Sequence, residues 1–464
     1  MLICYHQMSI SSINPINGAI IKKYREDTDH SIGHKIDQAH QAWLNYKETD
    51  FETRSGLLLQ VSKLLTGRKD ELAELMALEM GKPLKAGVSE ILKCAAVCEY
   101  YAKNGAGFLA DQFIETDASK SYVSFQPIGV VLAIMPWNFP FWQVFRFLAP
   151  ALMAGNAGVL KHSSGVTGCA LEIERIIEDA GFPEHVFKTL ICSSKAIPKV
   201  IENPYIKAVT LTGSTEAGKK VAEQAGKLVK KTVLELGGSD PYIILEDADL
   251  EEAAKICAEA RLINNGQSCI AAKRFIVQES VAEKFTQLFK AEMESKRTGD
   301  PLLAETDLGP MARAELRDEL HQQVLQSIEQ GAKCILGGEI PSIAGHHAYY
   351  QPTILTQVKK GVLAYDEELF GPVAAIITAK DADDAIHIAN DTNFGLGAAV
   401  FTKNNALAED IARNKLAAGS CFVNQGVKSD VALPFGGINQ SGYGRELSMF
   451  GIHEFVNIKT VYIK

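Results

Sequence analysis

Apolar residues recur along the chain in two patterns that predict strands and helices in turn. Short runs such as Gly158–Lys161 and Ala208–Thr212 are apolar on both faces, which is typical of strands buried in a sheet. A segment such as Cys169–Gly181 has apolar residues at helical spacing and ends at a glycine. Strands that alternate with helices in this way predict a parallel α/β sheet.

The same pattern extends over the rest of the chain. Phe51–Met80 predicts long amphipathic helices, and Tyr122–Pro136 predicts an exposed strand that leads into a buried one. A second α/β series follows Gly238. Its predicted strands are Tyr242–Leu245, Arg274–Gln278, Tyr349–Leu355, Val373–Ala379 and Ala398–Thr402, and the chain closes on a strand within His453–Lys464.

Composition and charge are those of an ordinary globular protein. The 464 residues are 47% hydrophobic and 22% charged, with a formal net charge of -9. The acidic balance argues against a nucleic-acid partner, and no apolar run reaches the ~18 residues that would indicate a membrane-spanning helix. The first residues do not resemble a signal peptide, and Met8 is an alternative start. We therefore expect a cytoplasmic protein without nucleic-acid or membrane partners.

The cysteines and histidines do not predict a metal site. Nine cysteines are scattered without the spacing of a disulfide framework, which fits a reducing compartment. Cys94 and Cys98 lie one helical turn apart, but two thiols without further ligands are typical of a protein core. The eleven histidines form no metal-binding motif.

One glycine-rich stretch raises the question of a nucleotide triphosphatase. Gly213–Lys219 nearly fits the phosphate-loop pattern, and the strand Tyr242–Leu245 ends in acids. A triphosphatase needs a hydroxyl after the loop lysine to hold magnesium, whereas this chain has Lys220. A strand, a glycine turn and a helix N-terminus suit the pyrophosphate of a dinucleotide equally well, although the usual G-x-G-x-x-G fingerprint is absent. The residues disfavour a triphosphatase and leave a variant dinucleotide site open.

Four short segments offer side chains for chemistry. Cys269 lies in the polar segment Asn264–Arg274, where a thiol is expected to be presented rather than embedded. Glu235 stands between apolar residues at a glycine turn, and Asn138 is bracketed by prolines and aromatic residues. Glu367–Val373 places an acid before a Phe-Gly-Pro turn. Each signal is weak alone, because an inert buried cysteine or a solvated acid explains it as well.

Together these segments resemble the aldehyde dehydrogenase superfamily. The resemblance covers nearly the whole chain and keeps the order of the motifs "PWNFP", "GNAGVLK", "LTGST", "LELGG", "GQSC", "EELFGPV", "NFGLGAAVFT" and "PFGGINQSGYGRE". Details such as "LKHSS" and "FGIHEFVNIKTV" are most similar to the bacterial succinate-semialdehyde dehydrogenase branch. The resemblance implies oxidation of an aldehyde to a carboxylic acid through a cysteine thioester. A non-catalytic protein on this fold is the distant alternative, and the retention of Cys269, Glu235 and Asn138 argues against it.

The resemblance implies roles for these three residues. Cys269 would attack the aldehyde as a thiolate, and the Asn138 amide with the Cys269 backbone N–H would hold the oxyanion. Glu235 would activate the water that hydrolyses the thioester. The catalytic set is therefore expected to be Cys269, Glu235 and Asn138.

The resemblance also implies a site for NAD or NADP. Lys161 would hold the adenosine ribose, and Glu368 would hold the nicotinamide ribose. Ser164 stands where NAD-preferring relatives often carry a glutamate, so that the 2′-phosphate of NADP has room. The predicted cofactor-binding set is Pro136, Trp137, Lys161, Ser164, Gly213, Ser214, Leu236, Glu368 and Phe370.

For the substrate, the resemblance implies a short aldehyde with a distal carboxylate, succinate semialdehyde first. Arg146 stands where semialdehyde-oxidising relatives carry an anchoring arginine, and a guanidinium grips both carboxylate oxygens. Where some relatives place a second arginine, this chain has Ile263, so Lys428 and Ser429 are expected to help. A surface salt bridge is the alternative role for Arg146. A broad-specificity enzyme for another small aldehyde is the alternative function.

The implied subunit is α/β and has three parts. A variant Rossmann dinucleotide domain would comprise residues 1–106 and 127–237, and an α/β catalytic domain would comprise residues 238–440. A small β arm, residues 107–126 and 441–464, would pair with another subunit. Because an arm strand has an unpaired edge, we expect a homo-oligomer, either a dimer or a tetramer.

Overall fold

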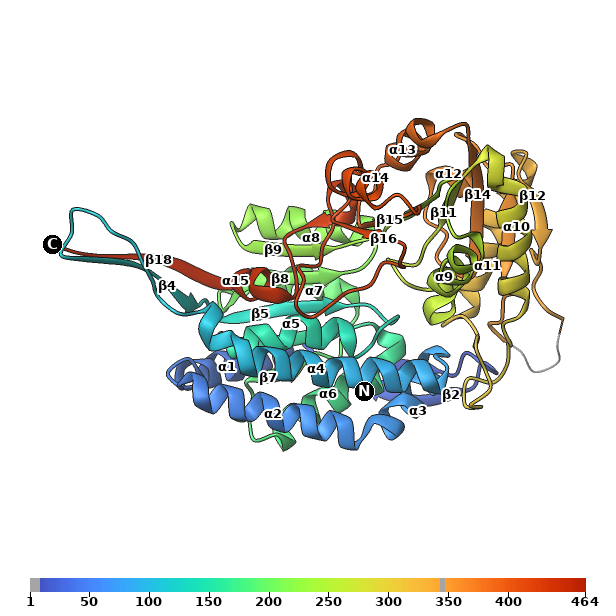
Figure 1. Cartoon of the computed structure of the whole chain (residues 1–464). Coiled ribbons are helices and arrows are strands. Elements are labelled where there is room, and N and C mark those ends of the chain that lie inside the picture. The colour runs from blue at the N-terminus through green and yellow to red at the C-terminus, as the bar shows by residue number, and fades with distance from the viewer. Residues whose placement is uncertain (1–8, 343–346) are drawn as a thin grey trace, which may run out of the picture.

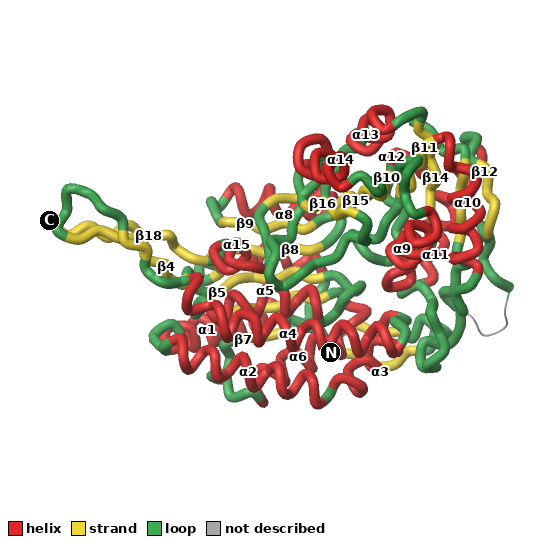
Figure 2. Tube along the Cα trace, in the orientation of Figure 1, coloured by secondary structure: helices red, strands yellow, loops and turns green. Residues whose placement is uncertain are grey.

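The computed structural model describes residues 9–342 and 347–464, so Cys4 and the alternative start Met8 lie outside the described residues. Two α/β bodies lie side by side, and a thin β ribbon projects from the one that holds the N-terminal half (Figure 1). Helices flank the strands in both bodies (Figure 2). Within the described ranges, no helix combines the length and apolarity needed to cross a membrane.

The first body is built on a six-stranded sheet of order β17-β9-β8-β5-β6-β7. All neighbours are parallel except β17, which pairs antiparallel with β9. The predicted buried strands are confirmed here, and the sheet gains an antiparallel edge that the sequence pattern did not predict. The strands are β5 (Val130–Met135), β6 (Ala157–His162), β7 (Phe187–Thr189), β8 (Ile206–Thr212), β9 (Lys231–Glu235) and β17 (Gly442–Tyr443).

Helices cover this sheet and share one hydrophobic core with it. The predicted amphipathic segment Phe51–Met80 forms two helices that are interrupted at Arg68. Helix α4 packs against α2, α3 and α5, and it forms one wall of the candidate active site. The principal helices are α1 (Asp29–Tyr46), α2 (Phe51–Gly67), α3 (Lys69–Met80), α4 (Leu84–Phe108), α5 (Trp142–Met153), α6 (Thr167–Asp179) and α8 (Thr215–Lys227).

The second body is built on a seven-stranded sheet of order β12-β13-β14-β11-β10-β15-β16. Successive residues of β10 belong to different cores, because Ile243 packs on one face and Tyr242 on the other. Both faces are therefore buried, as the apolar runs predict. The strands are β10 (Pro241–Ile244), β11 (Arg274–Gln278), β12 (Lys333–Leu336), β13 (Thr353–Thr356), β14 (Val373–Ala379), β15 (Gly397–Phe401) and β16 (Ser420–Val423).

Most strand predictions in this body are confirmed, β11 and β14 with the predicted bounds. The strand predicted at Tyr349–Leu355 begins later, at Thr353, directly after Pro352, which has no backbone N–H to donate to a neighbouring strand. The helices that carry the chain between the strands are α9 (Leu250–Leu262), α10 (Glu279–Glu294), α11 (Ala314–Glu329), α12 (Leu363–Asp366), α13 (Ala382–Asn390) and α14 (Asn405–Asp410).

The projecting ribbon is an antiparallel sheet of β3 (Gln112–Phe113), β4 (Lys120–Pro127) and β18 (Val456–Ile463), with the C-terminus near its tip (Figure 1). Phe113 is 67% exposed and Ile458 is 62% exposed. Gly442 and Tyr443 lie in the segment that the sequence assigned to this arm, yet they pair with β9 in the first body. They do so because Gly442 has φ +116° and fits directly against the Leu234 carbonyl.

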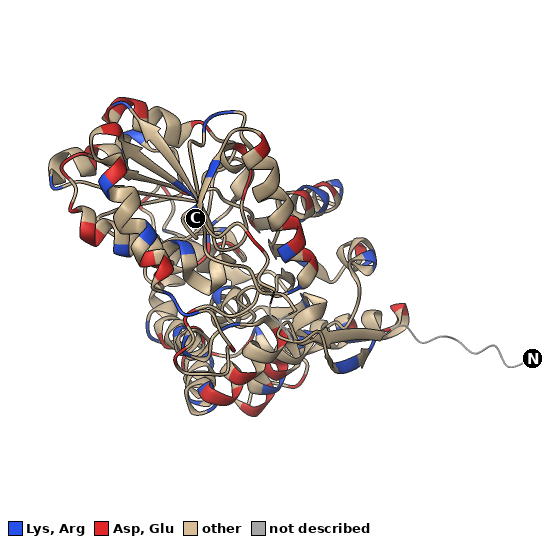
Figure 3. Cartoon of the chain, turned by 90° about the vertical axis from the view of Figure 1, so that its right-hand side faces the viewer, with Lys and Arg blue, Asp and Glu red and all other residues tan. Residues whose placement is uncertain are grey.

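Acidic and basic residues alternate along the helices of both bodies (Figure 3). Among the residues that the structure describes, no group of three His, Cys, Asp or Glu side chains is arranged to hold a metal ion.

Candidate active site

Parallel pairing gathers the predicted cofactor residues at one edge of the six-stranded sheet. Ile134 is in register with Lys161 and with Leu211, and Thr212 is in register with Glu235. Because parallel strands end at the same edge, the loops that follow β5, β6, β8 and β9 meet there. Those loops and strand ends carry Pro136, Trp137, Asn138, Lys161, Ser164, Gly213, Ser214, Glu235 and Leu236.

The glycine turn after β8 opens directly onto the N-terminus of α8. The Ser214 hydroxyl accepts a hydrogen bond from the Ala217 N–H, and Gly213 is partly exposed. This end of the helix presents backbone N–H groups and the positive end of the helix dipole, which suit a pyrophosphate. Lys219 is exposed and pairs with Glu216 at 2.9 Å on the helix surface, so it does not reach over the turn as a triphosphatase lysine does.

A buried histidine joins the end of β6 to the loop after β5. The His162 Nε2–H donates to the Pro140 carbonyl at 2.9 Å, and Nδ1 accepts from the Ser163 N–H at 2.9 Å. Burial lowers the pKa of His162 to about 4, so the ring is neutral at physiological pH. Ser164 begins a short 3-10 helix beside it and is partly exposed.

The loop that carries Cys269 is fixed by its own polar side chains. Asn264, Asn265 and Gly266 have φ of 54°, 57° and 74°, three successive left-handed residues. The Asn265 amide donates to the Gly81 and Pro310 carbonyls at 3.0 and 2.9 Å. These polar side chains are buried and hydrogen-bonded to the backbone around them.

Cys269 itself is only partly buried. It lies on the wall of a cavity that is lined by residues of both bodies. Burial raises its pKa to about 12, against the opposing charges of Arg146 and Lys273. The Lys273 ammonium donates to the Ser268 and Cys269 carbonyls at 2.9 and 2.6 Å, which holds the backbone at Cys269 in place.

Asn138 is joined to the same loop. Its side-chain N–H donates to the Gln267 carbonyl at 3.1 Å, and its backbone carbonyl accepts from the Asn264 amide at 2.7 Å. An amide nitrogen carries two N–H groups, so one remains for an oxyanion next to Cys269.

Glu235 ends β9 with its side chain 2% exposed. Neither carboxyl oxygen has a hydrogen-bond partner among the described residues. Burial raises the pKa of Glu235 well above its usual range, Glu446 raises it further, and Arg146 opposes the shift. Burial therefore favours the protonated form of Glu235, and the carboxyl can serve as a base once it loses its proton.

Glu368 reaches the first body from the second. It pairs with Lys273 at 3.0 Å and accepts from the Gly238 N–H at 3.2 Å. Phe370 meets the Trp137 ring edge-on, with centroids 5.8 Å apart. The sequence interpretation missed Lys273, which links the cysteine loop to Glu368. Its position four residues after the cysteine was the available signal.

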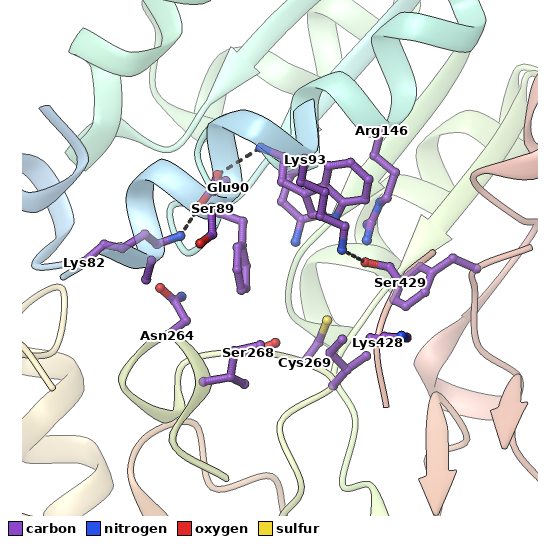
Figure 4. Close-up of a pocket in the computed structure, with 17 residues that line it drawn as sticks. Lys82, Ser89, Glu90, Lys93, Arg146, Asn264, Ser268, Cys269, Lys428 and Ser429 are labelled. Carbon is purple, nitrogen blue, oxygen red and sulfur yellow. Dashed lines mark hydrogen bonds and ion pairs between the residues drawn. The ribbon is translucent and has the colours of Figure 1, made fainter. Parts of the chain in front are cut away.

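The cavity has a volume of about 340 Å³ and brings together four predicted residues: Cys269, Arg146, Lys428 and Ser429 (Figure 4). Asn138, Glu235 and the predicted cofactor residues do not line it. The cavity therefore gathers the predicted nucleophile and the predicted substrate residues, while the sheet edge gathers most of the predicted cofactor residues.

Arg146 is not the surface salt bridge that the sequence left open. Its side chain is buried, its Nε pairs with Glu446, and its guanidinium lies 4.6 Å from the centre of the Phe435 ring. Its Nη2 also lies 3.4 Å from the Thr212 hydroxyl. Its charge is therefore already compensated within the protein.

The sequence interpretation missed three charged residues at or beside α4. Lys93 donates to the Ser429 hydroxyl at 2.6 Å, and its ammonium lies 4.3 Å from the centre of the Trp142 ring. Glu90 pairs with Lys82. Its carboxylate also accepts hydrogen bonds from the backbone N–H groups of Phe141 and Trp142 at the start of α5. The available signal was Glu90, a charged residue that lies four positions before Cys94 on the buried face of α4.

The chain matches the Aldehyde dehydrogenase family over residues 5–461. It is 48% identical to a probable succinate-semialdehyde dehydrogenase (NADP+) of Synechocystis sp., covering 98% of this chain and all of that protein. It is 44% identical to succinate-semialdehyde dehydrogenase (NADP+) 1 of Mycobacterium bovis, with 98% and 100% covered. The crystal structure of succinic semialdehyde dehydrogenase from Streptococcus pyogenes in complex with NADP+ is similar in fold, with TM-score 0.95, 37% identity, and 98% and 99% covered.

Proposed function

Because this chain belongs to the aldehyde dehydrogenase family, we propose that it oxidises succinate semialdehyde to succinate, with NADP as its preferred cofactor and NAD as an alternative. One observation carries the proposal. The nucleophilic cysteine stands in a cavity whose wall also carries Lys93 and Lys428, neither of which has an acidic partner among the described residues, and such a wall favours an aldehyde that bears a carboxylate. The relatives' names support the same substrate and cofactor.

The first step belongs to Cys269. As a thiolate it adds to the aldehyde carbon, and the carbonyl oxygen becomes an oxyanion that the free Asn138 N–H and the Cys269 backbone N–H stabilise. Because burial raises the pKa of the thiol to about 12, the thiolate depends on nearby positive charge, which Arg146 and Lys273 supply. The Lys273 contacts to the loop keep the sulfur aimed into the cavity.

The dinucleotide, when bound, supplies the acceptor for the hydride that leaves the substrate carbon. The N-terminus of α8 beyond Gly213 and Ser214 fits its pyrophosphate, because the donors at the start of the helix are backbone N–H groups and Gly213 has no side chain to stand before them. Lys161 and Glu368 would hold its two riboses, with Trp137 and Phe370 flanking the nicotinamide end.

The last step regenerates the enzyme. Glu235, once deprotonated, takes a proton from a water whose oxygen adds to the thioester carbon. The carbon–sulfur bond then breaks, the carboxylic acid leaves, and Cys269 recovers its thiol. The absence of a hydrogen-bond partner for either Glu235 oxygen, among the described residues, leaves the carboxyl free for this water.

The assay that tests the proposal compares kcat/KM for succinate semialdehyde and butanal, its apolar counterpart, with NADP and with NAD. We expect succinate semialdehyde with NADP to exceed butanal with NADP by at least about tenfold. Equal values for the two aldehydes would replace the proposed substrate with the broad-specificity alternative. A lack of activity with every aldehyde would favour the non-catalytic one.

We also propose a cytoplasmic homo-oligomer built through the arm, with the three parts that the resemblance implies. The apolar residues Phe113 and Ile458 on the ribbon support this, as do the free thiols of all described cysteines. Light scattering of Ile458→Lys and wild type tests the oligomer, since a charge on the arm should shift the molar mass towards the monomer.

A further inference from the structure

Lys93 is a half-buried cation without an acidic partner. Among the described residues it makes no ion pair, and its one hydrogen bond goes to the neutral Ser429 hydroxyl at 2.6 Å. Its stem and ammonium lie against the Trp142 ring, which shields them from water. A partly desolvated ammonium without a counter-ion is costly, so the cavity favours a ligand that brings a negative charge.

The other cations of the cavity are differently placed. Lys82 is buried and pairs with Glu90, and Arg146 is buried and pairs with Glu446. Lys428 is exposed at the rim, where water and salt screen its charge. Lys93 therefore combines two properties that none of the others combines, namely desolvation and an uncompensated charge.

Lys93 also has the right orientation. It projects from α4 towards the sulfur of Cys269, which points into the cavity from the opposite side (Figure 4). An ammonium has three N–H donors, of which Ser429 uses one, and the Ser429 hydroxyl keeps its own proton to donate. Lys93 and Ser429 together thus present donors to one anionic group.

We propose that Lys93, held by Ser429, is the principal binding group for the distal carboxylate of the substrate and determines specificity for an ω-carboxy aldehyde. The inference rests on the proposed function and refines it, because the resemblance had implied that Arg146 anchors the substrate carboxylate. In the structure the carboxylate completes an ion pair that Lys93 lacks, whereas at Arg146 it competes with Glu446.

The surroundings of Lys93 also predict a pH signature. Burial lowers the pKa of Lys93 to about 8, and Arg146 on α5 lowers it further, against the opposing effects of Cys94 and Glu90 on α4 and of Asp430 in the loop after Ser429. A lysine of raised or ordinary pKa would stay charged to higher pH. Here the charge is present below about pH 8 and is lost above it, so preference for an anionic substrate should fall across that pH in the free enzyme.

The test uses two neutral replacements in the full-length enzyme. Lys93→Met keeps the packing on Trp142, and Lys93→Gln keeps a donor for Ser429. Lys103→Met, on an exposed position of the same helix, is the matched control for the loss of one charge. We expect kcat/KM for succinate semialdehyde to fall at least about tenfold in both Lys93 variants, with butanal changing less than about twofold.

Both aldehydes react with Cys269, so the ratio of kcat/KM for succinate semialdehyde to that for butanal does not change with the titration of Cys269. The ratio therefore reports the titration of Lys93. In wild type this ratio should fall above about pH 8, and in the Lys93 variants it should be flat. Losses that are equal for both aldehydes would overturn the proposal, as would a Lys93 variant with wild-type preference.

A second readout does not depend on turnover. Isothermal titration calorimetry with succinate should give a Kd at least about tenfold weaker in Lys93→Met than in wild type and Lys103→Met. No succinate binding by wild type, or equal Kd values, would overturn the proposal. An enzyme that binds succinate through Lys93 but oxidises neither aldehyde would instead overturn the proposed function alone.

Discussion

The two halves of the site are built in different ways. The cofactor half is the edge of one parallel sheet, where the residues that follow β5, β6, β8 and β9 meet because the strands run in one direction. The substrate half is a cavity assembled from α4, α5, the cysteine loop and the segment around Ser429, which are far apart in sequence. The cofactor half is thus formed by the topology of the sheet, and the substrate half is formed by the packing of distant segments.

This difference affects how each half tolerates change. At the sheet edge the proposed pyrophosphate site consists largely of backbone N–H groups, whose positions are set by the fold itself. In the cavity, function depends on a few charged side chains whose partners decide which charges remain free for a ligand, as Arg146 and Lys93 illustrate. Substitutions of the charged side chains in the cavity should therefore have larger effects than substitution of Ser164 at the cofactor edge.

Cys269→Ala should give the largest effect. Without the sulfur no thioester forms, and NADP reduction should fall by at least about 10⁴-fold while the fold persists. The matched control is Cys257→Ala, which changes a fully buried thiol on α9 and should keep most activity. Stopped-flow absorbance of the reduced cofactor measures both. Persisting turnover in Cys269→Ala would show that another thiol carries the acyl group.

Glu235→Gln should come next, because only one step depends on it. We expect a burst of reduced cofactor followed by turnover slowed by about 10²–10³-fold, since the thioester has lost its base. The raised pKa of Glu235 means that its basic form increases as pH rises, so the wild-type steady-state rate should rise with pH and that of the variant should not. A normal steady-state rate in the variant would remove Glu235 from the mechanism.

The sequence predicted the sheet edge well. A strand such as Ala208–Thr212 can be predicted because its apolar run is uninterrupted. The glycine turn after that strand determines where helix α8 begins. Several short strands escaped prediction, among them β7, β9 and the antiparallel partners β17 and β12, because a short strand is placed by the neighbour with which it pairs.

The cavity was harder to predict. The sequence does not show that Arg146 forms an ion pair with Glu446, about three hundred residues later. Nor does it show that Lys93 forms no ion pair among the described residues. Likewise, the sequence does not show that the Asn265 amide in the cysteine loop donates its hydrogen bonds to the carbonyls of Gly81 and Pro310. Such pairings appear only when distant segments are packed together.

Arg146→Ala tests that pairing. Its removal leaves Glu446 as a buried carboxyl without its cation, which costs about 3–5 kcal/mol in comparable cases. We expect a lower thermal midpoint and a similar loss of kcat/KM for succinate semialdehyde and butanal, because the damage is to the scaffold. Arg146→Lys should recover part of the stability. A loss confined to succinate semialdehyde, with unchanged stability, would return the role of principal anchor to Arg146.

Ser164→Glu should have the smallest effect and acts on the cofactor edge alone. The side chain begins the short helix after β6 and is partly exposed, so a carboxylate fits there without disturbing a buried contact. It would accept hydrogen bonds from a free ribose diol and repel a 2′-phosphate. We therefore expect the ratio of kcat/KM for NADP to that for NAD to fall by about tenfold, with kcat changing little. Ser164→Gln has the same size without the charge, and it separates repulsion from crowding. If both variants shift the ratio equally, crowding is the cause. If neither does, Ser164 lies outside the cofactor site, and the selectivity of this edge resides in its backbone rather than in its side chains.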